Sequence, residues 1–204
     1  MSTSTFQSQS IGKIALATGV IGVSTLIFGL IFTFAGDVVP IFYSLNDLFN
    51  LIMALMSGVL AWLLYFRFRE NMTSLHVGLL VLILIGMILA VIGFWMIAIK
   101  GTGYLQSGWY TNTAYALIGL WIISLNYTAW QNDLLSKGLS LFGVIIGVVM
   151  ALGFSAIPGM IQNIDSTYFM SPIHYGIWNA SLAGWIILYP LWCMLLGRHL
   201  LKQR

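Results

Sequence analysis

Residues 77–99 read VGLLVLILIGMILAVIGFWMIAI, a run in which no side chain is charged and only Trp95 can form a strong hydrogen bond. A helix needs about 20 mostly apolar residues to cross the hydrocarbon core of a bilayer. Inside that core a backbone must satisfy its own hydrogen bonds, and a continuous apolar run of this length does so as a helix. The stretch therefore predicts a transmembrane helix.

The rest of the chain has the same composition. Of its 204 residues, 60% are hydrophobic and 6% are charged, and the mean hydropathy is +0.96. A soluble domain carries about 25% charged residues, so this chain cannot cover itself with a water-facing surface. The net charge of +3 comes from 8 basic and 5 acidic residues. This is too few for a nucleic-acid surface, and we expect the lipid bilayer as the main partner, with no nucleic acid.

Charged residues and turn formers separate the chain into six long apolar runs. We predict an all-α, polytopic membrane protein with one domain over residues 1–204. The predicted transmembrane helices cover about residues 14–35, 48–66, 77–99, 109–130, 138–157 and 172–196. Their alternation, with glycines on odd spans and polar side chains on even ones, suggests three tandem helical hairpins.

The basic residues indicate the orientation of the chain. Seven of the eight lie before the first span, after the last one, or in connections that follow even-numbered spans: Lys13, Arg67, Arg69, Lys137, Arg198, Lys202 and Arg204. Only Lys100 lies in a connection on the other side. Cytoplasmic loops are enriched in Lys and Arg, so the pattern predicts that both termini are cytoplasmic.

Gly143-Val-Ile-Ile-Gly147 is a GxxxG motif, which lets two membrane helices approach closely. One interpretation is packing within the bundle. Another is that Gly143 and Gly147 contact a second copy of the chain or a partner in a membrane complex. The sequence alone leaves both open.

Polar side chains gather on the second, fourth and sixth spans, and such side chains usually face the interior of a bundle. We expect an outward-opening cleft lined by amides and aromatic rings, which would bind a ligand. The predicted ligand-binding residues are Asn46, Asn50, Asn112, Tyr115, His174, Trp178 and Asn179. For each the alternative is structural: the amides join helices, the aromatic rings fill the core, and His174 bonds a neighbour near the start of the last span, where Ser171-Pro172 reads as a helix cap.

Asp47 has two interpretations. Ser44-Leu-Asn-Asp47 matches an S-x-x-D capping box, which would place Ser44 at the start of a helix. Alternatively, the Asp47 carboxyl protonates or binds a cation together with a group from another helix. Among the bulky aromatic residues, we expect Trp109 to lie in the belt at the membrane interface.

No motif for catalysis, phosphate binding or metal binding is present, and Cys193 is the only cysteine. We therefore predict no catalytic residues, no metal site and no cofactor. The favoured function is non-enzymatic binding or transport of a small apolar molecule or lipid; a substrate-binding subunit of a vitamin transporter has a similar size and helix count. The alternatives are an accessory subunit of a larger membrane complex and an enzyme that uses His174 and Asp47.

The stretch Gly119-Leu-Trp121-Ile-Ile-Ser-Leu-Asn126, followed by Asp133, Ser136-Lys137 and Gly143, resembles an uncharacterised bacterial family of six-helix integral membrane proteins. That family often has Pro-Arg where this chain has Ser136-Lys137. The resemblance implies the six-helix architecture and the plasma (inner) membrane of a prokaryote, and it implies no activity.

Overall fold

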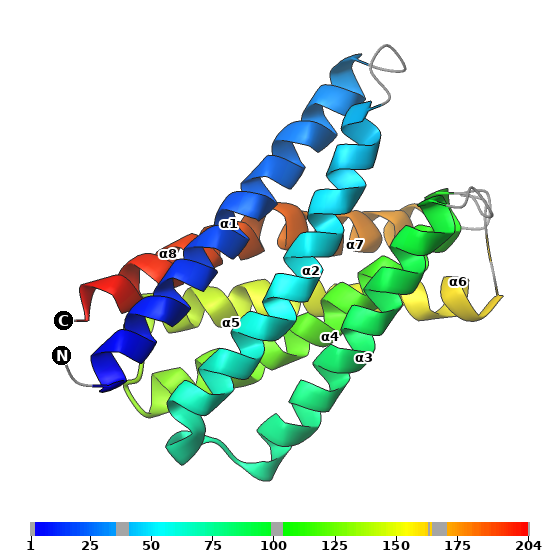
Figure 1. Cartoon of the computed structure of the whole chain (residues 1–204). Coiled ribbons are helices and arrows are strands. Elements are labelled where there is room, and N and C mark those ends of the chain that lie inside the picture. The colour runs from blue at the N-terminus through cyan, green and yellow to red at the C-terminus, as the bar shows by residue number, and fades with distance from the viewer. Residues whose placement is uncertain (1–2, 36–40, 99–103, 163, 165–170, 204) are drawn as a thin grey trace.

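The computed structural model describes residues 3–35, 41–98, 104–162, 164 and 171–203, which are helical almost throughout (Figure 1). The helices are α1 (Thr3–Ala35), α2 (Ile41–Phe68), α3 (Ser74–Ala98), α4 (Tyr104–Gln131), α5 (Lys137–Ala151), α6 (Ile157–Gln162), α7 (Pro172–Ala183) and α8 (Tyr189–Lys202). Three short helical segments complete them: η2 (Arg69–Asn71), η3 (Leu152–Ala156) and η5 (Gly184–Leu188). The predicted all-α class is confirmed for this part of the chain.

Five helical segments among the described residues are long and apolar enough to cross a membrane. They are Ser8–Phe34, Ser44–Asn71, Ser74–Ile97, Lys137–Gln162 and Pro172–Lys202. The last two are composite, because α5 continues through η3 into α6, and α7 continues through η5 into α8. The chain is therefore a multi-pass membrane protein by the length and composition of its helices.

The fourth predicted span, residues 109–130, forms α4 but is not among these five segments. Helix α4 is buried on almost every side from Ser107 to Ala129, by α3, α5, α6, α7 and η3. Its buried polar side chains include Thr111, Asn112 and Asn126. Because α4 is surrounded by protein, it does not need the apolar surface of a lipid-facing helix, and the predicted count of six spans is not confirmed.

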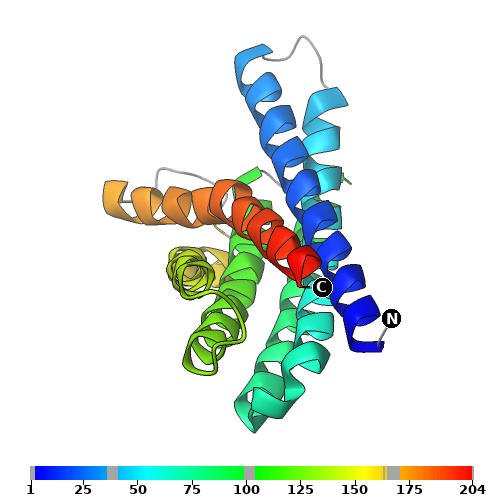
Figure 2. The same ribbon diagram turned by 90° about the vertical axis from the view of Figure 1, so that its left-hand side faces the viewer.

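The long helices alternate in direction. The first turns of α1 and the last turns of α8 lie side by side at one end of the molecule (Figures 1 and 2). The turn from α2 to α3 and the turn from α4 to α5 lie at that same end (Figure 1). Six basic residues therefore belong to this end: Lys13, Arg67, Arg69, Lys137, Arg198 and Lys202. We call it the basic end; Lys100 and Arg204 lie outside the described residues.

The GxxxG motif has its partner within the chain. A Cβ atom on Gly147 would lie 2.7 Å from the Gly119 backbone oxygen, and one on Gly119 would lie 2.8 Å from the Gly147 oxygen. A Cβ atom on Gly143 would collide with the Asn126 side chain. Both glycines of the motif are thus buried against α4, so the interpretation that Gly143 and Gly147 contact another chain is wrong.

A second glycine-lined contact joins α1 to α8, at the opposite ends of the sequence. Gly12 lies against the backbone of Gly197, and Gly19 lies against Pro190 and Met194. The helix pairs with the most extensive contacts thus include α1 with α8 and α4 with α5, in addition to α1 with α2 and α3 with α4. The arrangement as three tandem hairpins is not confirmed, because small residues also permit close packing between helices of different proposed hairpins.

Two prolines lie within continuous helical paths. The helix of the predicted span 138–157 does not stop before Pro158, since η3 leads into α6, which begins at Ile157 and continues to Gln162. Pro190 follows the π-helical segment η5, in which the Tyr189 amide donates to the Gly184 oxygen, five residues earlier. Because proline has no amide proton to donate, this change of hydrogen-bond register accommodates Pro190 within the helix.

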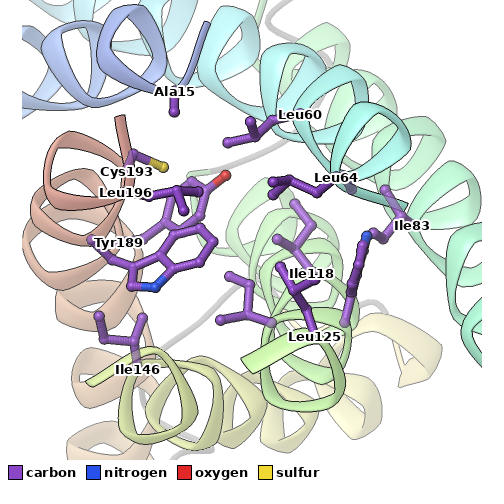
Figure 3. Close-up of a cluster of buried hydrophobic side chains, with 14 of the residues drawn as sticks. Ala15, Leu60, Leu64, Ile83, Ile118, Leu125, Ile146, Tyr189, Cys193 and Leu196 are labelled. Carbon is purple, nitrogen blue, oxygen red and sulfur yellow. The ribbon is translucent and has the colours of Figure 1, made fainter. Parts of the chain in front are cut away.

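The main core lies between α1, α2, α3, α4, α5 and α8 and is filled by aliphatic and aromatic side chains (Figure 3). Leu60 and Leu64 of α2 approach Ile118 and Leu125 of α4, with Tyr189 of α8 beside them (Figure 3). A smaller cluster at the other end contains Trp109, Ala156 and Trp178. Trp109 is only 1% exposed, so its placement in an interfacial belt is wrong.

The α4–α5 contact gives a stability prediction. Gly147→Val places a branched side chain against the Gly119 backbone, and overpacking of this kind costs about 1–3 kcal/mol. We expect a lower thermal unfolding midpoint in detergent. Gly78→Ala is the control, because nothing lies within 4 Å of a Cβ atom there, and it should leave the midpoint unchanged or raise it slightly. Equal midpoints for Gly147→Val and wild type would contradict the close approach.

Candidate functional site

Four aromatic rings form a stacked column through the middle of the bundle. The ring centroids of Tyr115 and Trp185 are 4.1 Å apart, those of Trp185 and Tyr189 5.2 Å, and those of Tyr189 and Trp192 6.0 Å. The planes of the first two pairs differ by only 10° and 8°. Trp185 of η5 and Tyr189 and Trp192 of α8 can stack because their spacing puts them on one face of this continuous helix.

Three rings of the column donate hydrogen bonds to polar side chains of neighbouring helices. The pairs are Trp185 Nε1 to Asn50 Oδ1 at 3.1 Å, Tyr189 OH to Ser57 Oγ at 2.8 Å and Trp192 Nε1 to Asn126 Oδ1 at 3.3 Å. The polar residues of α2 and α4 thus meet the aromatic residues of η5 and α8 in the interior. Along the column from Tyr115 to Trp192, side chains fill the space where we expected a cleft.

A small cavity remains beside Tyr115, at the end of the column that lies away from the basic end. Its volume is about 50 Å³. Its polar lining comes from α2 and α4, and its apolar lining from α3, α4, α7 and η5. The lining residues are Asn46, Asp47, Asn50, Phe94, Ile97, Ser107, Gly108, Thr111, Asn112, Tyr115, Trp178, Leu182 and Ile186.

Two polar atoms of buried residues at this cavity have no hydrogen-bond partner in the protein. They are Asn112 Oδ1, an acceptor, and Trp178 Nε1, a donor. The Asn112 amide nitrogen donates to the Gly108 oxygen at 3.1 Å, so the oxygen is the unpaired atom of this amide. An unpaired buried donor or acceptor costs about 1–3 kcal/mol, so an occupant that pairs with both atoms gains that energy.

The size of the cavity limits its occupant. One water molecule takes about 30 Å³ in the liquid, so the cavity has room for a few heavy atoms. Asn50 is less available than Asn112, because its amide nitrogen donates to the Asn46 oxygen at 3.0 Å and its Oδ1 accepts from Trp185. The geometry therefore suits a very small ligand with one donor and one acceptor.

The structure brings five of the seven predicted ligand-binding residues to this cavity: Asn46, Asn50, Asn112, Tyr115 and Trp178. The other two lie elsewhere. His174 Nε2 is 2.6 Å from the Ser155 backbone oxygen, to which it donates, and Asn179 Nδ2 donates to the Tyr175 oxygen at 2.9 Å. Ser171 accepts a hydrogen bond from the His174 amide, which confirms the predicted cap of α7.

Asp47 does not belong to a capping box. Helix α2 begins at Ile41, so Ser44 lies within the helix and cannot cap it, and that interpretation is wrong. Asp47 is half-buried and lines the cavity, with Asn112 of α4 among the other lining residues. The second interpretation, a carboxyl that protonates or binds a cation together with a group from another helix, stays a prediction. His174 does not line this cavity, so the two residues of the enzyme alternative do not share it.

A second polar cluster, which the sequence pattern did not predict, lies near the basic end. His76 is 4% exposed, and its Nδ1 accepts from the Thr73 amide at 3.1 Å. The neutral ring therefore carries its proton on Nε2, which lies 3.1 Å from both Ser124 Oγ and Thr128 Oγ1. The sequence feature that could have predicted this cluster is the i, i+4 spacing of Ser124 and Thr128, which puts both hydroxyl groups on one face of α4. This cluster joins α3 to α4.

No group of three or more metal-ligating side chains occurs among the residues that the structure describes. No protein-family model, curated protein or solved structure matches the chain. The resemblance to an uncharacterised bacterial six-helix family therefore stays a prediction that depends on the residues from Gly119 to Gly143.

The Asn50–Trp185 hydrogen bond can be tested with a double-mutant cycle. Asn50→Ala leaves the buried indole of Trp185 unpaired, and we expect a loss of about 1–3 kcal/mol in unfolding free energy. In the Trp185→Phe background the same change should cost less, with a coupling of about 0.6–1.7 kcal/mol, as for other hydrogen bonds between membrane helices. Unfolding in mixed detergent measures both.

Asn179→Ala is the matched control for this cycle, because the Asn179 amide bonds only a backbone oxygen of its own helix. It should be close to neutral and should show no coupling with Trp185→Phe. A coupling of zero between Asn50 and Trp185 would contradict the contact.

Proposed function

We propose that the chain is a non-enzymatic membrane protein that binds a small molecule in the cavity beside Tyr115. The observation that carries the proposal is the pair of unpaired buried atoms, Asn112 Oδ1 and Trp178 Nε1, at one cavity. A protein that only needed a stable core would gain from replacing them with apolar groups, because unpaired polar groups lower stability.

The ligand class follows from the lining. Phe94, Ile97, Leu182 and Ile186 supply apolar walls, and the amide and indole groups fix orientation. At about 50 Å³ the cavity suits a compact molecule of a few heavy atoms, rather than a vitamin or a whole lipid. Transport of this ligand, rather than binding alone, would require the aromatic column to move.

We also propose that α4 crosses the membrane, giving six spans. The 28 residues of α4 are sufficient for a crossing, and two termini at one end fit an even number of crossings. By the positive-inside rule the basic end is then cytoplasmic, with both termini inside. The prokaryotic plasma membrane as location depends on the family resemblance.

The alternative role, an accessory subunit of a larger membrane complex, needs a docking surface other than the GxxxG motif. Helix α3 presents Val77, Val81, Leu84 and Ile88, each about half exposed, along one face. A lipid-facing helix has the same surface. This face therefore does not favour the accessory role over the ligand-binding role.

Asn112→Leu tests the proposed function. It removes the unpaired acceptor at nearly constant side-chain size, so we expect unchanged or higher thermal stability together with loss of the bound molecule. Native mass spectrometry of the gently extracted protein measures retained mass. Wild type and the control Asn179→Ala should carry a small adduct that Asn112→Leu lacks.

Two results would contradict the proposal. One is a wild-type chain without a small adduct under conditions that preserve lipid adducts, which would indicate that the cavity holds water only. The other is an adduct that Asn112→Leu retains in full, which would place the ligand elsewhere.

A further inference from the structure

A larger groove lies between the start of α5 and the end of α8. Both of these segments belong to the basic end (Figure 1). Its volume is about 690 Å³. Ser136, Gly138, Leu139 and Phe142 line it from the α5 side, and Leu195, Arg198, His199 and Lys202 line it from α8. The groove is distinct from the small cavity, shares no lining residue with it, and has no role in the function proposed above.

The lining of the groove changes from apolar to basic along α8. Leu195, Arg198, His199 and Lys202 have the i, i+3, i+4, i+7 spacing that places side chains on one helix face. Leu195 is the member farthest from the chain terminus, and Arg198 and Lys202 are exposed near that terminus. Leu139 and Phe142 continue the apolar lining on α5. The groove therefore combines an apolar floor with a cationic rim.

The positive charge of this rim is not balanced by acidic side chains of the described residues. The ion pair found among them joins Lys137 to Asp133 at 3.8 Å, and neither partner lines the groove. Of the other described acidic residues, Asp47 lies at the far cavity and Glu70 in the turn after α2. Arg198 and Lys202 are thus available to an external anion.

The α5 side of the groove complements the rim. Ser136 caps α5 without a side-chain hydrogen bond, so the first amide groups of the helix receive no acceptor from it. A Cβ atom on Gly138 would have open space around it, so an anion can approach the backbone there. The positive end of the helix dipole adds to the attraction that Arg198 and Lys202 exert.

We propose that this groove binds an anionic phospholipid, with the headgroup phosphate between Arg198, Lys202 and the start of α5. One acyl chain would lie along Leu195, Phe142 and Leu139. A free phosphate would use the rim and leave the apolar floor exposed, whereas a phospholipid covers both. Basic pockets between membrane helices at the cytoplasmic surface are suited to such headgroups, and anionic lipids are enriched in that leaflet.

Lipid titration followed by native mass spectrometry tests the proposal on the full chain in a mild neutral detergent. The probes are palmitoyl-oleoyl phosphatidylglycerol, the phosphatidylcholine with the same acyl chains, and inorganic phosphate. We expect wild type to prefer the phosphatidylglycerol. Because each basic residue near a charged headgroup is worth about fivefold in affinity, Arg198→Gln/Lys202→Gln should weaken phosphatidylglycerol binding by about 25-fold.

The matched control is Lys13→Gln/Arg69→Gln, which removes the same charge from two exposed residues that do not line the groove. Its phosphatidylglycerol affinity should stay within about twofold of wild type, because exposed distant charges are screened. Arg198→Lys retains the charge and should retain the preference. Comparison of its thermal unfolding with that of the double variant separates a binding defect from misfolding.

Four outcomes would overturn the proposal. These are equal binding of the two lipids, an equal loss of affinity in the control, displacement of the lipid by millimolar inorganic phosphate, and a dimer whose formation abolishes lipid binding. The first two indicate no specific site, the third a site for a free anion, and the fourth a groove that a second copy of the chain covers.

Discussion

The structure depends on the burial of one helix that is too polar for lipid. Helix α4 carries Thr111, Asn112, Thr113, Asn126 and Thr128 in positions less than a tenth exposed. A polar group in hydrocarbon without a partner is costly, so α4 has to be enclosed by other helices. Several side chains of α4 satisfy themselves locally: the amides of Asn112 and Asn126 donate to backbone oxygens four residues earlier.

The helices around α4 contact it through small residues and through polar side chains. Glycines 143 and 147 bring α5 against it, and Gly86 and Gly93 do the same for α3. The indole of Trp192 donates a hydrogen bond to the Asn126 side-chain oxygen, and His76 forms hydrogen bonds with hydroxyl groups of α4. Close approach and polar pairing are thus two aspects of one packing solution, since an amide can bond across helices only where the backbones lie close together.

The sequence predicted the features that depend on local pattern. Long apolar runs predicted the all-α class. Amide and aromatic side chains gather on α2, on α4 and on the path from α7 through η5 to α8, and this pattern predicted that these side chains contact one another. Five of the predicted residues do line one cavity. The wrong predictions concern tertiary neighbours and a helix boundary. Gly143 and Gly147 pack against α4 rather than another chain, Trp109 is buried, and α2 begins before Ser44. Periodicity identifies a face, but the neighbour of that face is a property of the tertiary fold.

The aromatic column separates the two proposed sites. The small cavity borders Tyr115 at one end of the column, and a void of about 20 Å³ lies near Tyr189 and Trp192. That void has room for about one water molecule, so this conformation offers a ligand of several heavy atoms no path along the column. Passage of a ligand along the column would require the rings to separate. Trp185 and Tyr189 lie in or next to the π-helical turn at 184–188, where the hydrogen-bond register already differs from that of an α-helix. In the function proposed above this conformation would correspond to binding, and movement of Trp185 and Tyr189 is the step that transport would add.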